Sequence, residues 1–479
     1  MKTLIDVIEG HVMNNPSKKA IFSNNLDLTY SELDIQMSKF ARGLNNFPKN
    51  SIVSLLFDNS INFVISYLGT LKAGHVAHII SPNISYDDLL FQIKSAKSKL
   101  LVIENEFFEK ITNYKLPLEI KKFEDIGSTF SDRSEYQYGD IAHLLFTSGT
   151  TSEPKGIPVT HSNMIFTLEN IISILKYDSF DVALLPLPLH HSFGLGCMNT
   201  TLYSGGTLIL LNNASDLPLI LESIRKYKVT TFSVVPTTLI KLIKFHKKDV
   251  EELFSNLRLI LTNSTSIPPQ TVFEYKSILN KGHLSTYYGL SEASRSTFMI
   301  FEKFLDKDSS VGKPAPNVDI EIRNKKENVG EIWIRGPNVI NHYWNNPIAD
   351  KNLINGWLKT GDLGYFDEDG FLFLSGRLDD VINVGGEKVF PEYVENVIRR
   401  LKGIEQVVVI GQKHEVFGQT VKAFVKLNHD TTLKKSDILS FCIRNLEKFM
   451  VPAKIEFIDK IPVTEYGKIK RFLFKSEDE

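Results

Sequence analysis

The sequence predicts an α/β protein with a large N-terminal domain and a small α+β C-terminal domain. Two observations support this fold class. Short apolar runs alternate with helical patterns through the middle of the chain, and from Val318 the sequence changes to strands and turns. Alternating strands and helices are typical of βα units and a mainly parallel sheet. The 479 residues are enough for about two or three domains with a sizeable buried core.

The first clear helix follows a polar loop near residue 150. Apolar residues at 164, 165, 168, 171, 172 and 175 repeat with a helical period, which predicts a helix over 162–175 with Ser162 as its N-cap. Beyond it, buried strands are expected over 207–211, 229–235 and 257–261, and helices over 218–227 and 237–245. This alternation accounts for the βα-built sheets of the large domain.

The second half of the chain predicts a small β-barrel-like part and then a compact C-terminal unit. Strands are expected over 319–323 and 330–336, before a turn-rich region over 371–389. The C-terminal unit is expected to contain helices over 391–401 and 436–449 and strands over 407–410, 421–427 and 454–458. We therefore place the domain boundary near Asp379, with an N-terminal domain over 1–378 and a C-terminal domain over 379–479.

Composition excludes several functional classes. Lys and Arg number 55 against 56 Asp and Glu, and this balance argues against a nucleic-acid-binding or polybasic membrane-surface protein. No uncharged apolar run reaches the roughly 18–20 residues of a membrane helix, and early acids rule out a signal peptide. Cys197 and Cys442 are flanked by apolar sequence, which indicates reduced core residues. The expected location is the cytoplasm.

A loop rich in hydroxyl groups runs from Phe146 to Gly156. It offers backbone N–H groups, hydroxyls and one lysine to a polyanion, which is what nucleotide phosphates require. The candidate phosphate-binding residues are Thr147, Ser148, Gly149, Thr150, Thr151 and Lys155. No Gly-Lys-Ser/Thr opens a helix here, so the loop is not of the Walker type. The alternative is an ordinary Ser/Thr/Gly surface loop.

Three further clusters combine groups that suit a nucleotide. In Tyr288-Gly-Leu-Ser-Glu292 the aromatic ring could stack on a base and the carboxylate could hold Mg²⁺, although a turn followed by a helix cap would look the same. Asp362 follows a glycine and could accept hydrogen bonds from ribose hydroxyls, or could be a turn residue. Arg377 could bind ribose or phosphate oxygens, or pair with a neighbouring acid.

Two more clusters concern the acid substrate and the reaction. His190 and His191 lie in a loop bounded by prolines, but no third ligand at useful spacing supports a metal site. His191 could line an organic substrate pocket or be a half-buried structural histidine. Lys468 follows a glycine and could reach into a cleft, whereas most lysine-rich C-termini are merely solvated.

Taken together and in order, these clusters resemble the adenylate-forming superfamily of acyl-CoA synthetases, adenylation domains and luciferases. The likeness covers essentially the whole chain and is closest to the acyl- and aryl-CoA ligases, through the His-x-Phe-Gly pattern after His190. Further matching segments lie at 28–33, 71–74 and 330–336. The resemblance implies that ATP and Mg²⁺ activate a small carboxylic acid to an acyl-adenylate, with release of pyrophosphate. A thiol then takes the acyl group: coenzyme A, or the phosphopantetheine of a separate acyl or peptidyl carrier protein.

The resemblance also implies a role for each residue. The loop from Thr147 to Lys155 would hold the β- and γ-phosphates, Tyr288 would stack on adenine, and Gly289 would be a further ATP-binding residue. Ser291 would touch the α-phosphate, Glu292 would bind Mg²⁺, and Asp362 and Arg377 would grip the ribose. Lys468 would bridge the α-phosphate and the incoming carboxylate; with Glu292 and His191 it forms the expected catalytic set. Asp379 would be the hinge of a mobile C-terminal domain, which would bring Gly385 and Gly386 to the thiol.

Two departures from the family pattern stand out, and two rival functions can be compared. Ser152 replaces a usual glycine, and Asn263-Ser-Thr-Ser266 replaces a frequent Gly-Gly-Ala, which predicts a more polar or narrower pocket. The stretch 188–194 has no acid to hold an ammonium group, which disfavours α-amino acids. A catalytically silent relative would be expected to lack Lys468, Glu292 or Asp362, and a plain ATPase or kinase would need a Walker lysine.

Overall fold

The computed structural model describes residues 2–23, 26–126, 139–147, 154–265, 267–302, 306–326, 328–428, 431–462 and 469–475. The chain divides into two compact units, one made of 1–319 with 334–358 and the other of 320–333 with 359–479. The second unit therefore includes residues 320–333 and 359–378, which precede Asp379, because these residues pack with the C-terminal part of the chain. The boundary and hinge at Asp379 therefore stay predictions.

The first unit is built on two sheets that are mainly parallel, which confirms the α/β class. One sheet has the order β6-β5-β3-β4-β7-β8 and the other β15-β14-β13-β12-β11-β9-β10-β1-β2. The strands of the first sheet are β3 (Ile52–Leu56), β4 (Val76–Ile80), β5 (Leu100–Ile103), β6 (Glu119–Lys122), β7 (Ile141–Thr147) and β8 (Lys155–Thr160). Those of the second are β1 (Lys19–Ser23), β2 (Leu26–Thr29), β9 (Val182–Leu185), β10 (Thr207–Leu210), β11 (Thr231–Val234), β12 (Leu259–Thr262), β13 (His283–Leu290), β14 (Ala293–Phe301) and β15 (Lys313–Pro314).

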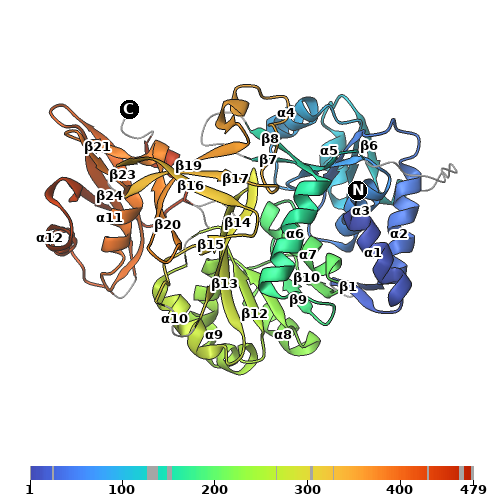
Figure 1. Ribbon diagram of the computed structural model, residues 1–479, viewed down its shortest axis with the longest axis horizontal. Coiled ribbons are helices and arrows are strands. Elements are labelled where there is room, and N and C mark those ends of the chain that lie inside the picture. The colour runs from blue at the N-terminus through green and yellow to red at the C-terminus, as the bar shows by residue number, and fades with distance from the viewer. Residues whose placement is uncertain are drawn as a thin grey trace. The chain divides into compact units, whose positions relative to one another are not determined.

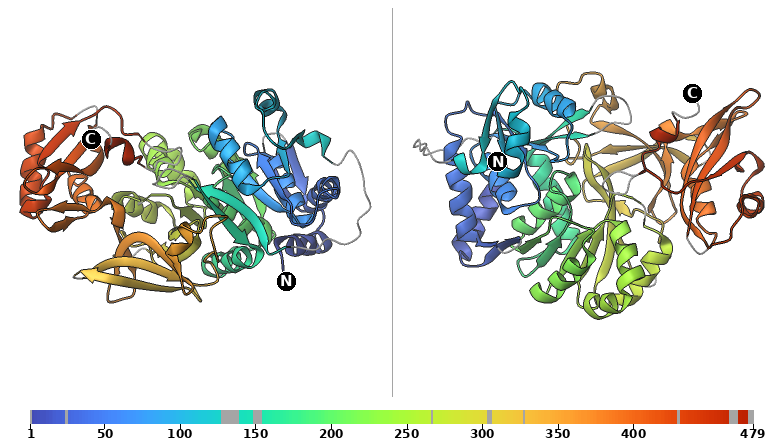
Figure 2. Two further views of the ribbon diagram at one scale, coloured as in Figure 1. Left: turned by 90° about the horizontal axis from the view of Figure 1, so that it is seen from above. Right: turned by 180° about the vertical axis from the view of Figure 1, so that it is seen from behind.

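Helices cover these sheets and fill the space between them. They are α1 (Leu4–Asn14), α2 (Tyr30–Gly43), α3 (Ile61–Lys72), α4 (Tyr86–Ala96), α5 (Asn105–Thr112), α6 (His161–Leu175), α7 (Ser192–Tyr203), α8 (Leu217–Tyr227), α9 (Pro236–Phe254) and α10 (Pro269–Ile278). Helices α8 to α10 lie along the nine-stranded sheet (Figures 1 and 2). Helix α6 contacts β7 and β8 of one sheet and β14 of the other, so it lies between the two sheets.

Two details of the helices differ from the sequence prediction. The N-cap of α6 is Thr160, not Ser162: its hydroxyl accepts the Asn163 N–H at 3.0 Å while the Asn163 side chain accepts the Thr160 N–H. This reciprocal capping starts the helix one residue earlier than predicted. Helix α9 runs on to Phe254, although the pattern predicted an end near residue 245. His246 has a non-helical backbone (φ −136°, ψ 35°), so a kink interrupts the apolar period there.

The second unit and the strands that lead into it contain two small sheets. The first has the order β16-β17-β19-β18, with β20 also paired to β19, where the small β part was predicted. Its strands are β16 (Asp319–Lys326), β17 (Val329–Arg335), β18 (Leu353–Ile354), β19 (Trp357–Phe366) and β20 (Leu372–Arg377). The second has the order β22-β21-β24-β23, with β25 parallel to β24. Its strands are β21 (Ile382–Val384), β22 (Glu387–Val389), β23 (Ile404–His414), β24 (Gly418–Leu427) and β25 (Lys454–Phe457).

The remaining helices complete the α+β C-terminal part. They are α11 (Pro391–Ile398), α12 (Lys435–Asn445) and α13 (Phe472–Lys475), with short 3-10 turns η1 (Phe123–Asp125), η2 (Ala349–Asn352), η3 (Leu378–Asp380) and η4 (Lys448–Met450). Both α11 and α12 end about three to four residues before the predicted limits. Cys197 and Cys442 are free and buried, as predicted. Among the helices that the structure describes, none has the length and apolar character needed to cross a membrane. The cytoplasmic location stays a prediction.

Candidate active site

The two ends of the predicted phosphate loop lie side by side. Strands β7 and β8 pair in antiparallel fashion, and Thr147 is the direct partner of Lys155. The residues between them that were predicted to bind phosphate, Ser148 to Thr151, lie outside the described residues, as does Ser152. The hairpin therefore presents Thr147 and Lys155 at the same end of the sheet.

Lys155 and Glu292 are linked through Tyr343, a residue that the sequence analysis missed. The Lys155 ammonium lies 5.9 Å from the centre of the Tyr343 ring, and the Tyr343 hydroxyl donates to Glu292 Oε1 at 3.1 Å. Burial, followed by the negative charge of Glu292, raises the pKa of Tyr343, so its hydroxyl keeps its proton and donates. The sequence holds only a weak signal for Tyr343, an aromatic pair ahead of Asn-Asn-Pro.

Backbone pairing holds this arrangement in place. The Ile340 N–H donates to the Glu292 carbonyl at 2.9 Å, and the Trp344 N–H donates to the Gly156 carbonyl at 2.8 Å. The segment 340–344 thus bridges the β7–β8 hairpin and the turn that carries Glu292. The predicted phosphate-binding lysine and the predicted metal-binding carboxylate come together from positions 137 residues apart (292 − 155).

Tyr288, Gly289 and Ser291 lie at the end of β13 and in the turn before β14. Tyr288 is mostly buried, with 7% of its surface exposed, and its backbone N–H donates to Thr297 Oγ1 at 3.1 Å. A Cβ added to Gly289 would lie 2.4 Å from the backbone nitrogen of Arg295, so this position requires glycine for the close approach of β14. The adenine contact of Tyr288 stays a prediction.

Asp362 and Arg377 form an ion pair across two strands. They are direct partners in the β19–β20 pairing, and Arg377 Nη1 lies 2.9 Å from Asp362 Oδ1. Arg377 Nε is buried and has no hydrogen-bond partner among the residues that the structure describes. Gly361 has φ +71°, a left-handed conformation that glycine adopts without strain. The two predicted ribose residues are therefore adjacent and already oriented toward each other.

His191 lies at the start of α7, as its N-cap residue. Burial, with a smaller contribution from the neighbouring His190, lowers the pKa of His191 to about 3, so the imidazole is neutral near neutral pH. The two rings are 4.6 Å apart between centroids. The cavity described next is lined by Ser192 and not by His191. The catalytic or pocket role of His191 stays a prediction.

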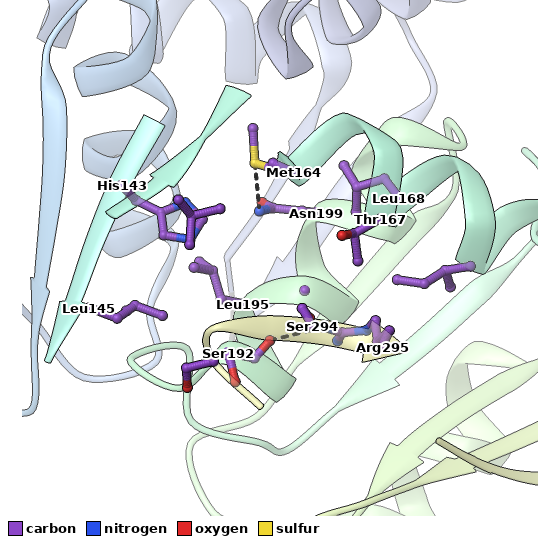
Figure 3. Close-up of a pocket in the computed structure, with 14 residues that line it drawn as sticks. His143, Leu145, Met164, Thr167, Leu168, Ser192, Leu195, Asn199, Ser294 and Arg295 are labelled. Atoms are coloured by element: carbon purple, nitrogen blue, oxygen red, sulfur yellow. Dashed lines mark hydrogen bonds between the residues drawn. The ribbon is translucent and has the colours of Figure 1, made fainter. Parts of the chain in front are cut away.

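A cavity of about 450 Å³, counting its opening, lies among β7, β8, α6, α7 and the β13–β14 hairpin. Figure 3 shows His143 and Asn199 on one part of its wall and Ser192 and Arg295 on another. Its lining residues are His143, Leu145, Val159, Met164, Thr167, Leu168, Ile171, Ser192, Leu195, Gly196, Asn199, Ser291, Ser294 and Arg295. Ser291 is the only one of these that the sequence analysis proposed for the site.

The polar stretch that begins at Asn263 does not line this cavity in its described part. Asn263 Nδ2 donates to the Tyr287 carbonyl at 2.6 Å, and Ser264 has φ +92°. Ser266 lies outside the described residues. The more polar or narrower pocket predicted from this stretch therefore stays a prediction, while the cavity has polar groups of its own.

The C-terminal candidates lie on a tight hairpin and on a tail that is anchored. Val384 pairs with Glu387, so Gly385 and Gly386 form a two-residue turn, with φ of +59° and +95°. Positive φ at both positions is the type I′ geometry that favours two glycines. Asp379 lies in η3.

Lys468 lies outside the described residues, but Arg471, three positions later, is held firmly. Its guanidinium pairs with the buried Glu395 of α11, donates to the Val409 carbonyl at 2.7 Å, and lies 3.6 Å from Asp380 beside the predicted hinge. A buried pair of this kind fixes the geometry of the groups that it joins. The C-terminal tail is therefore tied to both α11 and η3.

The fold, together with the residue clusters predicted to bind a nucleotide, is that of the adenylate-forming enzymes. The chain belongs to the AMP-binding enzyme family, which it matches over residues 8–344, and it matches the AMP-binding enzyme C-terminal domain over 393–468. It is an AMP-forming acid–thiol ligase of the acyl-CoA synthetase type.

Several known proteins are similar along their whole length. An oxalate–CoA ligase of Arabidopsis thaliana is 30% identical, with 98% of this chain and 97% of the relative covered. A long-chain-fatty-acid–CoA ligase of Bacillus subtilis (strain 168) is also 30% identical, with 100% and 95% covered. The structure of the o-succinylbenzoate CoA synthetase MenE of B. subtilis with its acyl-adenylate, OSB-AMP, has a TM-score of 0.88 at 26% identity, covering 98% and 97%. ATP-bound MatB of Rhodopseudomonas palustris, at 24% identity with 99% and 98% covered, has the same fold, with a TM-score of 0.91.

Proposed function

We propose that this enzyme joins a small carboxylic acid to the α-phosphate of ATP, releases pyrophosphate, and transfers the acyl group to the thiol of coenzyme A. One observation carries the proposal. The β13–β14 turn presents Ser291 to the cavity and Glu292, through Tyr343, to Lys155. A pocket for an organic acid and groups suited to phosphate and metal thus meet at one turn.

The residues fit Mg²⁺ as a partner of ATP. Glu292 supplies one carboxylate, and the described residues contain no group of three His, Cys, Asp or Glu side chains able to hold a metal. Mg²⁺ is commonly held by one or two carboxylates together with substrate phosphates, and when bound it neutralises phosphate charge. Glu292 would therefore hold the ion, with Tyr343 orienting the carboxylate.

The protein's part in the first step is positioning and charge neutralisation. The acid's carboxylate oxygen attacks the α-phosphorus, and the bond from that phosphorus to the pyrophosphate oxygen breaks. Lys155 and the loop after Thr147 would stabilise the departing pyrophosphate, and Asp362 with Arg377 would hold the ribose. In the second step the thiol sulfur displaces AMP from the acyl carbon and gives up its proton.

Coenzyme A is the proposed acceptor because the two relatives named above are CoA ligases, and this chain is similar to them over 97% and 95% of their length. Transfer to the phosphopantetheine of a separate carrier protein is the alternative. The two acceptors are distinguished by an assay of the purified enzyme with ATP, Mg²⁺ and an accepted acid. Either coenzyme A or a carrier protein bearing phosphopantetheine is supplied as the thiol, and AMP release and thioester formation are measured.

The test of the first step is carboxylate-dependent exchange between ATP and labelled pyrophosphate across short, aryl and long-chain acids. Exchange that depends on an acid is expected. Lys468→Ala should nearly abolish it while thioester formation from a supplied acyl-adenylate survives. Absence of exchange with every acid, in a protein that still binds ATP, would contradict the proposed activity. Equal loss of both half-reactions would contradict the role of Lys468.

A further inference from the structure

The cavity contains a buried cation that the reaction described above does not use. Arg295 is 3% exposed, and among the described residues no acidic side chain forms an ion pair with it. Its Nη1 donates to Ser294 Oγ at 2.8 Å and to the Ser192 carbonyl at 3.4 Å, and its Nη2 donates to the Phe193 carbonyl at 3.2 Å. Its Nε is buried and has no hydrogen-bond partner among the described residues. A buried guanidinium whose donors are incompletely used is costly unless an anion completes it.

The backbone and the neighbouring helix are shaped around this side chain. Arg295 has φ +54°, a left-handed conformation that costs energy for a residue with a side chain and is concentrated at functional sites. A Cβ added to Gly196 would lie 2.3 Å from the Arg295 guanidinium, so glycine in α7 makes the room for it. The guanidinium also stacks on Tyr287, 4.8 Å from the ring centre.

The rest of the wall is uncharged but partly polar. Burial lowers the pKa of His143 to about 3, so its imidazole is neutral near neutral pH, and Arg295 is then the one charged side chain of the fourteen that line the cavity. Asn199 donates to the Tyr67 hydroxyl at 3.1 Å, while its Oδ1 is buried and has no partner in the described part of the chain. A plain alkyl chain would leave Arg295 Nε and Asn199 Oδ1 without a hydrogen-bond partner.

We propose that the substrate is a short dicarboxylic acid, whose reacting carboxylate lies at Ser291 and whose second carboxylate binds Arg295. Both residues line one cavity and come from the same β13–β14 hairpin, Ser291 from its turn and Arg295 from β14, so a short acid could reach both. A carboxylate would receive charge-assisted hydrogen bonds from the guanidinium, stronger than those of a neutral group. This inference rests on the proposed acid-activating function.

The experiment compares acids matched in length with wild-type enzyme: succinate with butyrate, and glutarate with pentanoate, by pyrophosphate exchange. The expected kcat/KM for the diacid is roughly 100-fold or more above that of its partner, because a site built for a polar group rejects the analogue that lacks it. Arg295→Met should remove most of this preference, with activity toward the monoacid kept or raised. Arg295→Lys, which keeps the positive charge, should restore part of it.

The outcomes separate the two proposals. If only monoacids support exchange, or butyrate equals succinate in wild-type enzyme, the diacid inference is wrong while the acid-activating function stands. If Arg295→Met lowers both acids equally with ATP binding intact, Arg295 is structural and the inference is again overturned. Absence of exchange with any acid would overturn both proposals. The wild-type comparison decides the matter even if the methionine variant fails to fold.

Discussion

Asp362 and Arg377 neutralise each other across β19 and β20 when no nucleotide is bound. Asp362 is 8% exposed, and its backbone N–H donates to Thr360 Oγ1 at 3.0 Å, which orients the strand at that point. A ribose would add hydroxyl donors to this carboxylate without requiring it to move far. An acceptor placed in advance costs little reorganisation on binding.

We therefore expect Asp362→Asn to raise the KM for ATP by roughly 10- to 100-fold, since a hydrogen bond to a charged group contributes about 1.5–3 kcal/mol. The measurement is steady-state exchange at varied ATP concentration. Asp319→Asn is the matched control: Asp319 pairs with Arg335 at 2.7 Å, but both side chains are more than half exposed. Such a surface pair contributes about 0–1 kcal/mol. A KM unchanged in Asp362→Asn would remove Asp362 from the ribose site.

Tyr343 connects Lys155, the predicted phosphate-binding lysine, to Glu292, the predicted metal-binding carboxylate. Tyr343→Phe keeps the ring beside Lys155 but removes the hydroxyl that donates to Glu292. We expect the Mg²⁺ concentration for half-maximal exchange to rise several-fold, because the carboxylate loses the contact that orients it.

Tyr30→Phe is the matched control for that substitution, since the buried Tyr30 hydroxyl donates to the Gly206 carbonyl at 2.8 Å, outside the candidate site. It should lose stability without a change in Mg²⁺ dependence. The same Mg²⁺ curve for Tyr343→Phe and wild-type enzyme would show that Tyr343 does not orient Glu292.

The β21–β22 hairpin illustrates how one element combines backbone geometry with a predicted thiol-side role. Its two-residue turn needs positive φ at both glycines, and the Gly385 N–H also donates to the Phe417 carbonyl at 2.9 Å. A Cβ added to Gly386 would meet no atom of the described residues within 4 Å, so the cost of alanine there comes from the backbone conformation.

For Gly386→Ala we expect a loss of about 1 kcal/mol in unfolding free energy. Transfer from a supplied acyl-adenylate to coenzyme A should fall several-fold, while pyrophosphate exchange is retained. Gly370→Ala is the control, because Gly370 has φ +77° and equally open space in the β19–β20 turn. It should lose similar stability with both half-reactions intact. Equal effects of the two substitutions on thiol transfer would contradict a thiol-side role for Gly386.

At the scale of the whole molecule, the chain forms two compact units. A rotation of the C-terminal domain about Asp379 between the two half-reactions stays a prediction. Asp379 lies in η3, and its neighbour Asp380 approaches Arg471 of the C-terminal tail. A hinge at this point would reorient the tail that contains Lys468. This account requires the backbone at Asp379 to change conformation.

Asp379→Pro should therefore reduce thiol transfer more than pyrophosphate exchange, because proline restricts φ and the conformation of the preceding residue. Single-turnover assays of each half-reaction provide the comparison. Asp379→Ala removes the carboxylate but leaves the backbone free, so it should affect the two half-reactions far less. A greater loss of exchange than of transfer would count against the hinge.

The family and the order of its clusters could be predicted from sequence because they depend on local patterns. The helix predicted over 162–175 and the strand predicted over 207–211 from apolar runs are present as α6 (His161–Leu175) and β10 (Thr207–Leu210), and Gly385 and Gly386 form a turn within the region predicted to be turn-rich. Boundaries were less accurate where a cap or a kink decided them, as at Thr160 and His246. At those positions side-chain hydrogen bonds and local strain outweigh the periodic pattern.

By itself, the sequence indicated an adenylate-forming enzyme, because its short motifs resemble those of that superfamily in type and order; the phosphate, ribose and metal roles of their residues stay predictions. Only the tertiary structure brought Tyr343 to Lys155 and Glu292, and Arg295 and Asn199 to one cavity wall. These residues are far apart along the chain, and sheet pairing and helix packing join them. No local pattern encodes such contacts, because they depend on how whole elements pack.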